Sequence, residues 1–358
     1  MYSSLICPAT EQYPRNSEGD IAVLPDGRLL LAYTRFERGK EDDAPASIAG
    51  MYSSDAGRTW SQPTVLHAND ARQNCMSASL LLLPTTGELL LCFLRKNSST
   101  DLQVCLKRSP DLGRTWEEVT RVSDGTGYYV MNNARLLRLS TGRLVAPVAR
   151  CDDADGPETG TGHFRSGCYL SDDEGRTWRA PTSWVDLARR GAMEPAVVER
   201  KDGSLLMILR TQFGHVYRAE SSDGGETWAN VGPTPLLSPD SPASIARIPS
   251  SGDLLVVWND NYDRGLPLGG RRTPLRSAIS TDDGNMWLRY RTLERDIHRD
   301  YAYTSISFAG DETLLTYYER DCSGRISLRF RAVPTSWFYE LEDIGLRQYV
   351  YAGSGQHA

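Results

Sequence analysis

SSDAGRTW, residues 53–60, is the stretch that decides the fold, because the chain repeats it. The pattern Ser-x-Asp-x-Gly-x-Thr-Trp returns, with one imperfect copy, as SPDLGRTW at 109–116, SDDEGRTW at 171–178, SSDGGETW at 221–228 and STDDGNMW at 280–287. Successive copies begin 56, 62, 50 and 59 residues apart, which indicates one supersecondary unit copied many times. Ser and Asp bond to nearby backbone, Gly allows a tight turn and Trp supplies an apolar anchor, so the octapeptide is interpreted as structural.

A second periodic feature consists of two apolar segments that flank a short polar turn with a glycine. AVLPDGRLLLAY and SLLLLPTTGELLLCFL are the first two examples. Polar-Gly turns between β-rich runs predict β-hairpins. Six hairpins are predicted, and all but the last are followed by the octapeptide; their turn glycines are Gly27, Gly87, Gly142, Gly203, Gly252 and Gly310.

The two repeats together predict an all-β fold, a six-bladed β-propeller. A unit of about 57 residues has room for about four short strands, and radial repetition of four-stranded sheets is the propeller architecture. A solenoid is the alternative, although its repeats usually run shorter. No long segment shows a 3.6-residue period, so little helix is expected. Because no linker-like stretch interrupts the chain, residues 1–358 are predicted to form one propeller domain.

The composition argues against several classes of protein. A net charge of −6 and a pI near 5.5 argue against nucleic acid as a partner. The chain has no run of 18 apolar residues and starts without the basic and apolar regions of a signal peptide, which predicts a cytoplasmic protein with no membrane span unless a leader was removed. The seven cysteines and five histidines are scattered, so we expect reduced thiols, no metal centre and no cofactor.

Chemistry is expected at residues that do not repeat. The inner strands of a propeller converge on a central funnel, where a site is assembled from several blades. Charged residues that interrupt apolar strands are informative because a charge is costly to bury unless it is paired. The non-repeating set consists of Arg15, Asp43, Glu194, Arg210, Arg272, Tyr303 and Glu319.

In its order and spacing, this set resembles the exo-α-sialidase (neuraminidase) family. Arginines come from three predicted blades, an Asp-Ala-Pro loop follows the first hairpin, Arg210 follows Glu194 by 16 residues, and Glu319 follows Tyr303 by 16. The octapeptides correspond to the Asp boxes of that family, which other glycosidases, lyases and binding propellers also carry. The similarity extends from Arg15 to Glu319 and therefore covers nearly the whole chain.

The resemblance implies a role for each position. Arg15, Arg210 and Arg272 would clamp the carboxylate of a sialic acid, for which planar guanidinium groups are suited, and Glu319 would hold Arg15 in place. Tyr303 would be the nucleophile. Glu194 would accept its proton, because a phenol is a weak nucleophile without a neighbouring base. Asp43 would protonate the leaving oxygen and later activate water. Sialidases of this type are exceptions to the two-carboxylate rule of glycoside hydrolysis.

Several assignments have alternatives within the sequence. Arg15 is followed by Asn-Ser, where the family usually has Arg-Ile-Pro, so this position departs from the pattern. Asp42 competes with Asp43 as the acid, and Arg271 competes with Arg272 as the ligand. Arg35 is expected to contact a ring hydroxyl or Asp43, with a structural salt bridge as the alternative.

Structural explanations also exist for single members of the set. Glu194 and Arg210 form a buried ion pair in one such reading, Tyr303 is a core tyrosine, and Glu319 is a surface carboxylate. The pocket for the N-acyl group of the sugar is expected around Met76 and Asn132-Asn133.

The sequence thus predicts a retaining exo-α-sialidase that acts on sialylated glycans through a tyrosyl intermediate. The alternatives are a transfer or intramolecular variant of that enzyme, a hydrolase or lyase for another acidic sugar, and a sugar-binding propeller without catalysis.

Overall fold

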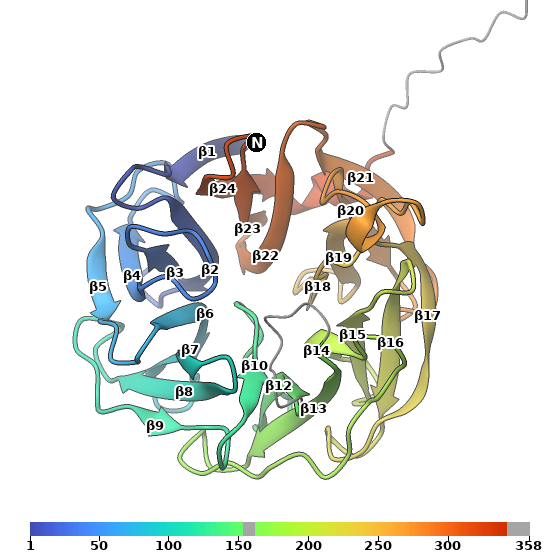
Figure 1. The fold of residues 1–358 in the computed structure, drawn as a ribbon, viewed down its shortest axis with the longest axis horizontal. Coiled ribbons are helices and arrows are strands. Elements are labelled where there is room, and N and C mark those ends of the chain that lie inside the picture. Colours follow the sequence, from blue (N-terminus) through green and yellow to red (C-terminus); the bar gives the residue numbers. More distant parts are fainter. Residues whose placement is uncertain (153–161, 342–358) are drawn as a thin grey trace, which may run out of the picture.

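The computed structural model describes residues 1–152 and 162–341, and these residues are almost entirely β-strand and turn. The strands lie in sheets arranged as a ring around a common centre (Figure 1). In the described ranges the only helices are two short 3-10 turns, η2 (Pro267–Gly269) and η3 (Thr335–Tyr339). The expectation of an all-β chain with little helix is therefore confirmed. None of the described helices is long and apolar enough to cross a bilayer.

Two sheets have eight strands each. The first runs β22-β23-β24-β2-β3-β4-β5, with β1 added at β24. Its strands are β22 (Asp300–Ala309), β23 (Glu312–Arg320), β24 (Ile326–Pro334), β1 (Tyr2–Cys7), β2 (Arg15–Val23), β3 (Leu29–Phe36), β4 (Ala46–Ser53) and β5 (Thr64–His67). The second runs β11-β12-β10-β8-β7-β6, with β13 at β12 and β9 at β8. Its strands are β6 (Asn74–Leu82), β7 (Leu89–Ser98), β8 (Asp101–Ser109), β9 (Thr120–Arg121), β10 (Tyr128–Val130), β11 (Leu137–Arg138), β12 (Leu144–Cys151) and β13 (Phe164–Ser171).

The other two sheets have four strands each, in sequence order. One contains β14 (Met193–Glu199), β15 (Leu205–Arg210), β16 (His215–Ser221) and β17 (Ala229–Leu237). The other contains β18 (Ser244–Arg247), β19 (Leu254–Asn259), β20 (Leu275–Ser280) and β21 (Leu288–Glu294).

Each eight-stranded sheet contains one parallel strand pair, in which a single residue of each strand is paired. In the first sheet Arg15 of β2 is the only residue registered with β24, opposite Ile326. In the second, Tyr128 of β10 pairs with Leu102 of β8. All other strand pairs are antiparallel, including β1 with β24, which joins the start of the described chain to its last strand.

All six predicted hairpins are present as antiparallel pairs: β2–β3, β6–β7, β11–β12, β14–β15, β18–β19 and β22–β23. Their turn glycines all have positive φ, a backbone conformation that glycine adopts without a steric penalty. The hairpin strands are rich in Leu, Val and Ile, and these side chains form buried clusters. This burial explains why the strands are apolar runs in the sequence.

The five octapeptides adopt the same hydrogen-bonded turn. In the first, the Ser53 hydroxyl donates to Asp55 and accepts from the Gly57 N–H, while Asp55 accepts from the N–H of Thr59. The other four repeat these three bonds at the matching positions. The structural interpretation of the octapeptide is consistent with this local geometry.

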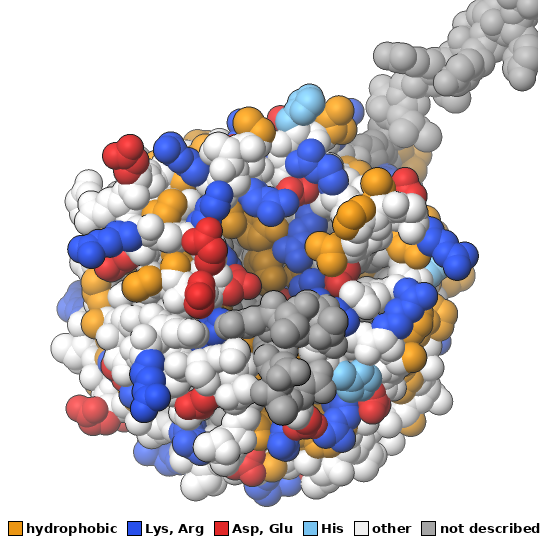
Figure 2. Space-filling model, viewed as in Figure 1, with side chains coloured by type: hydrophobic (Ala, Val, Ile, Leu, Met, Phe, Trp, Pro, Cys, Tyr) orange, Lys and Arg blue, Asp and Glu red, His pale blue; other side chains and the backbone are white. Residues whose placement is uncertain are grey.

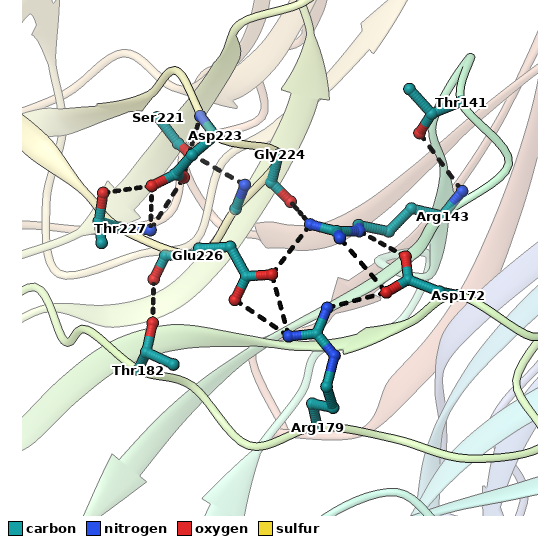
Figure 3. Close-up of polar contacts among 11 residues, drawn as sticks. Thr141, Arg143, Asp172, Arg179, Thr182, Ser221, Asp223, Gly224, Glu226 and Thr227 are labelled. Atoms are coloured by element: carbon teal, nitrogen blue, oxygen red, sulfur yellow. Dashed lines mark hydrogen bonds and ion pairs between the residues drawn. The ribbon is translucent and has the colours of Figure 1, made fainter.

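Each octapeptide glycine also packs against an apolar side chain from the strands of the preceding hairpin unit around the ring. The nearest such contacts of an added Cβ would be with Phe330 at Gly57, Leu30 at Gly113, Leu106 at Gly175, Leu170 at Gly225 and Leu206 at Gly284. Figure 3 shows one of these junctions. Arg143 donates to the carbonyl of Gly224 and pairs with Asp172 and Glu226. The octapeptides therefore connect neighbouring hairpin units around the ring.

Candidate active site

A shared backbone bulge places the main residues of the candidate site. In β2, β6, β14 and β22, which lie near the centre in Figure 1, one extra residue interrupts the pairing with the next strand. The first residue of each bulge has a positive φ: 53° at Glu18, 60° at Ser77, 45° at Glu194 and 57° at Tyr303. Bulges re-aim side chains, and non-glycine residues with positive φ cluster at functional sites. Two of the predicted catalytic residues occupy this position.

Tyr303 and Glu194 meet across the ring although they are 109 residues apart. The Tyr303 hydroxyl donates to Glu194 Oε1 at 3.1 Å, and Glu194 Oε2 accepts from Arg210 Nη1 at 2.7 Å. Arg210 Nε also donates to Asp240, whose other oxygen accepts from Gln212 at 3.1 Å. The geometry therefore brings together the predicted nucleophile, its predicted base and one predicted arginine.

Burial and charge control the protonation of Tyr303. Burial raises the pKa of the phenol well above its usual value and Glu194 raises it further, against the opposing charges of Arg272 and Arg210. The phenol is thus protonated in the free protein. Any attack by its oxygen has to be coupled to proton transfer, and Glu194 is the carboxylate in position to accept the proton.

Arg272 stands over the same tyrosine. Its guanidinium carbon lies 5.5 Å from the centre of the Tyr303 ring, and its Nη1 donates to the Tyr318 hydroxyl at 2.8 Å. Nη2 donates to the backbone carbonyl of Asp240 at 3.4 Å. Among the described residues, no carboxylate side chain pairs with Arg272. Arg271, the alternative, pairs with Asp300 instead and is half exposed.

Arg15 is buried, and most of its N–H donors form hydrogen bonds with residues 17–42. Nη2 donates to Glu18 at 2.8 Å, Nη1 donates to Asp42 at 2.6 Å and to the carbonyl of Lys40, and Nε donates to Ser17. Four hydrogen bonds therefore engage a group that has five N–H donors.

The prediction that Glu319 holds Arg15 is wrong. Glu319 is buried and pairs with Arg299 and with Arg329, the latter at 2.7 Å. Successive side chains of a strand point to opposite faces. Because Tyr318 contacts Arg272 and packs against the Tyr303 ring, the next residue, Glu319, points away from the site. Glu18 and Asp42 hold Arg15 instead.

The two acid candidates differ in their surroundings. Both lie on the loop between β3 and β4. The charge and hydrogen bond of Arg15 lower the pKa of Asp42, whose side chain is 75% exposed. Asp43 is exposed, and its side chain has no hydrogen bond or ion pair within the described part of the chain. Arg15 thus fixes Asp42 as an anion, while Asp43 is unconstrained. Figure 2 shows acidic and basic side chains around the hollow of this face.

Arg35 lies apart from this group. It stacks over the Tyr13 ring at 4.6 Å and lines a cavity of about 460 Å³ with Tyr33 and Trp60, between β1 and the first octapeptide. Arg35 contacts no Asp43 and forms no salt bridge in the described ranges, and its expected contact with a ring hydroxyl of the sugar stays a prediction.

The residues expected near an N-acyl pocket have structural contacts. Asn133 is fully buried, and its amide nitrogen donates to the carbonyls of Gly19 and Tyr303 at 2.7 and 3.0 Å. It therefore ties two of the bulges together. Met76 directly precedes the bulge residue Ser77. Asn132 is buried, and its amide nitrogen has no hydrogen-bond partner within the described part of the chain.

One group in the described ranges has three atoms of metal-ligand type: His67, Asp70 and Cys75, whose polar atoms lie within 4.8 Å of one another. Arg95 Nε already pairs with Asp70 at 3.2 Å, and burial raises the pKa of Cys75 to about 12, which keeps it a thiol. We assign no metal to this group. All seven cysteines are free, and six of them are buried.

Three site residues escaped prediction: Glu18, Asp240 and Tyr318. Glu18 is visible only when the inner strands are aligned by their bulges, and a bulge leaves no simple mark in the sequence. Asp240 comes from a turn-rich segment, SPDSPAS, without a strand pattern. Tyr318 belongs to an apolar run, a pattern that predicts a core residue and not a site residue.

The fold and the sequence place the chain in a known class. Residues 27–316 match the BNR repeat-like domain, so the chain belongs to that family, and its all-β architecture is the β-propeller of the sialidases. The chain is 28% identical over 317 residues to a sialidase of Micromonospora viridifaciens, a match that covers 77% of this chain and 46% of the relative. A sialidase of Bacteroides fragilis is 27% identical over 244 residues, 64% of this chain and 41% of that protein.

Solved structures agree on the fold. The Hadza microbial sialidase Hz136 superposes with a TM-score of 0.75 at 20% identity, over 93% of this chain and 68% of that one. A leech intramolecular trans-sialidase superposes with a TM-score of 0.72 at 15% identity, over 94% and 71%. The chain spans less than half the length of the two curated sialidases described above.

Proposed function

We propose that this protein is a retaining exo-α-sialidase, which hydrolyses terminal sialic acids from glycoconjugates through a covalent intermediate on Tyr303. The observation that carries the proposal is the convergence of Tyr303, Glu194 and Arg272 from three separate strands or loops. It joins a nucleophile, a base 3.1 Å from its hydroxyl and a guanidinium without a carboxylate partner among the described residues. Glycosidases that use paired carboxylates need no such arrangement.

In the first step, the carboxylate of the sugar binds Arg272, with Arg210 beside it. The anomeric carbon is then held above Tyr303. The phenolic oxygen attacks this carbon as its proton passes to Glu194 Oε1, and the bond to the leaving oxygen breaks. Asp43 gives its proton to that oxygen. A neutral nucleophile suits this substrate, because a carboxylate would be repelled by the acid group on the anomeric carbon.

In the second step, Asp43 accepts a proton from water, and the water oxygen attacks the anomeric carbon. The bond to Tyr303 breaks and the phenol recovers its proton from Glu194. Two inversions give net retention. We prefer Asp43 to Asp42 as the acid because Arg15 lowers the pKa of Asp42 and so holds its carboxylate ionised.

The proposal includes an architecture of six blades in one domain. Dividing each eight-stranded sheet at its single parallel contact gives four-stranded sets, and the four-stranded sheets supply two more. In this count β1 completes the last blade. Residues 342–358 of the proposed domain lie outside the described residues.

The test is release of 4-methylumbelliferone from its α-sialoside by the wild type, by Tyr303→Phe and by Tyr129→Phe as a buried-tyrosine control. We expect activity between pH 4 and 8, at least a hundredfold loss in Tyr303→Phe, and less than threefold loss in the control. An inactive wild type would overturn the sialidase proposal. An active enzyme indifferent to Tyr303→Phe would overturn the mechanism alone.

The product distinguishes hydrolysis from transfer. One structural neighbour is an intramolecular trans-sialidase in complex with 2,7-anhydro-Neu5Ac. Chromatography of the released sugar is expected to give free sialic acid, and an anhydro product would change the assignment from hydrolase to intramolecular transferase.

A further inference from the structure

Glu18 occupies the same backbone position as the two central residues of the site. Its bulge in β2 has the same register as those of Glu194 in β14 and Tyr303 in β22, and its φ of 53° lies between theirs. Asn133 bonds to the carbonyl of Gly19, next to Glu18, and to that of Tyr303, so one side chain fixes both bulges. The backbone thus presents Glu18 at the centre in the same way as Tyr303.

The two oxygens of Glu18 have different surroundings. Oε1 accepts from Arg15 at 2.8 Å. Oε2 is buried and forms no hydrogen bond of ordinary geometry with the described residues, and the nearest polar group that acts on this carboxyl besides Arg15 is the Thr34 hydroxyl of β3. The side chain is only 4% exposed. A buried carboxylate oxygen without a partner is costly unless it serves a purpose other than stability.

Burial disfavours the ionised form of Glu18. Burial, the largest effect, and the charge of Asp42 from the β3–β4 loop raise the pKa of Glu18, Arg15 and the Thr34 hydroxyl lower it, and the net pKa is raised. Tyr303 of β22 is the other titratable group that faces it. Arg15 already has Asp42, Ser17 and a backbone carbonyl as partners, so a second acid is not required to neutralise it.

We propose that Glu18 is a third functional side chain of the reaction centre: Oε1 holds Arg15, and Oε2 hydrogen-bonds a donor group of the bound sugar. This inference rests on the proposed sialidase function and adds to it a contact that selects the substrate. The donor is a hydroxyl or amide N–H of the sugar, because a second anion at this point would be repelled. Arg15 is then a positioning residue that orients Glu18, and it does not bind the carboxylate of the sugar.

The first experiment compares kcat and KM of Glu18→Gln and Glu18→Ala with those of the wild type. Glu319→Gln is the matched control, since it removes a buried carboxylate that points away from the site. We expect kcat/KM to fall at least tenfold in both Glu18 variants and less than threefold in the control.

A series of sialosides, each lacking one hydroxyl or the N-acyl group, then locates the contact. The wild type should discriminate at least tenfold against one member, because a site built to bond a donor rejects an analogue without it. Glu18→Ala should lose that discrimination and keep the others. Unchanged kcat/KM, or discrimination that persists in Glu18→Ala, would overturn the proposal.

The second experiment needs no substrate, so it separates this inference from the proposed function. A carboxyl group whose pKa is raised by folding destabilises the fold above its unfolded pKa, and the destabilisation disappears as the pH falls below that value. Glu18→Gln should therefore raise the Tm at pH 8 and leave it unchanged near pH 4. Glu319→Gln should lower the Tm at pH 8, because two arginines lose their carboxylate.

If the wild type neither binds nor cleaves sialosides, the proposed function fails and the stability experiment alone decides on Glu18. A Glu18→Gln variant whose Tm at pH 8 falls as far as that of Glu319→Gln would show that the carboxyl is only a structural ion-pair partner and would overturn the inference.

Discussion

At the scale of single residues, the site depends on which arginine side chains still have N–H donors available for a ligand. Arg15 and Arg210 are paired with acidic side chains, whereas the guanidinium of Arg272, among the residues described, bonds only to a tyrosine hydroxyl and a backbone carbonyl. A guanidinium has five N–H donors in a fixed planar arrangement, so Arg272 can still bind a carboxylate with two parallel bonds. The three arginines are thus unequal, although sequence comparison treats them alike.

We predict that Arg272→Ala raises KM for an aryl α-sialoside about 10- to 100-fold, because a hydrogen bond to a charged group contributes about 1.5–3 kcal/mol. Arg271→Ala is the control, since the half-exposed guanidinium of Arg271 pairs with Asp300 and lies outside the site. Steady-state kinetics of the two variants measure the difference. Equal effects on KM would contradict the assignment of Arg272 as the carboxylate ligand.

The sequence predicted those site residues that stand out by residue type alone, and it failed for residues whose orientation depends on strand register. Glu194, Arg210 and Tyr303 stand out because each interrupts an apolar run, and the structure does bring them together. Glu319 was misplaced because sequence spacing says nothing about which face of β23 a side chain occupies. Glu18 was missed for a related reason, since the bulge of β2 shifts the alternation of side chains by one residue.

At the scale of elements, the hairpins and octapeptides were predictable because both are local. A polar-Gly turn and a Ser-Asp-Gly-Thr turn are made by residues within eight positions of each other, so their hydrogen bonds follow directly from the sequence. What the octapeptide packs against is not local. Phe330 is 273 residues from Gly57, yet an added Cβ at Gly57 would lie 2.3 Å from its ring.

A comparison of two glycines separates the effect of backbone strain from the effect of packing against a distant side chain. Gly27 and Gly57 have the same φ of 83°, but an added Cβ at Gly27 meets nothing within 4 Å. We predict that Gly27→Ala lowers the free energy of unfolding by about 1 kcal/mol, from backbone strain alone. Gly57→Ala should lower it by about 2–4 kcal/mol, because overpacking against Phe330 is added. Urea unfolding of both variants measures the difference, and equal losses would mean that the packing of the first octapeptide against β24 contributes no stability.

At the scale of the whole molecule, the ring depends on a pairing between the two ends of the described chain. β1 adds to the free edge of β24, and its Tyr2, Ile6 and Cys7 pack into the cluster that includes Phe330. A ring of sheets removes exposed edges only if this last pairing forms. The sequence did not reveal it, because a six-residue strand at the start of a chain carries no repeat signal.

We therefore predict that deletion of residues 1–7 lowers the Tm by at least 10 °C and exposes the edge of β24. Exposed edges pair with other chains, so the shortened protein should also form dimers or larger species in size-exclusion chromatography. Leu5→Ala is the control, because Leu5 is the exposed apolar residue of β1, and it should leave both measurements unchanged. Since β1 does not contact Tyr303 or Glu194, any monomeric fraction of the shortened protein should keep its kcat. A stable, monomeric deletion variant would show that the contacts between neighbouring sheets close the ring without β1.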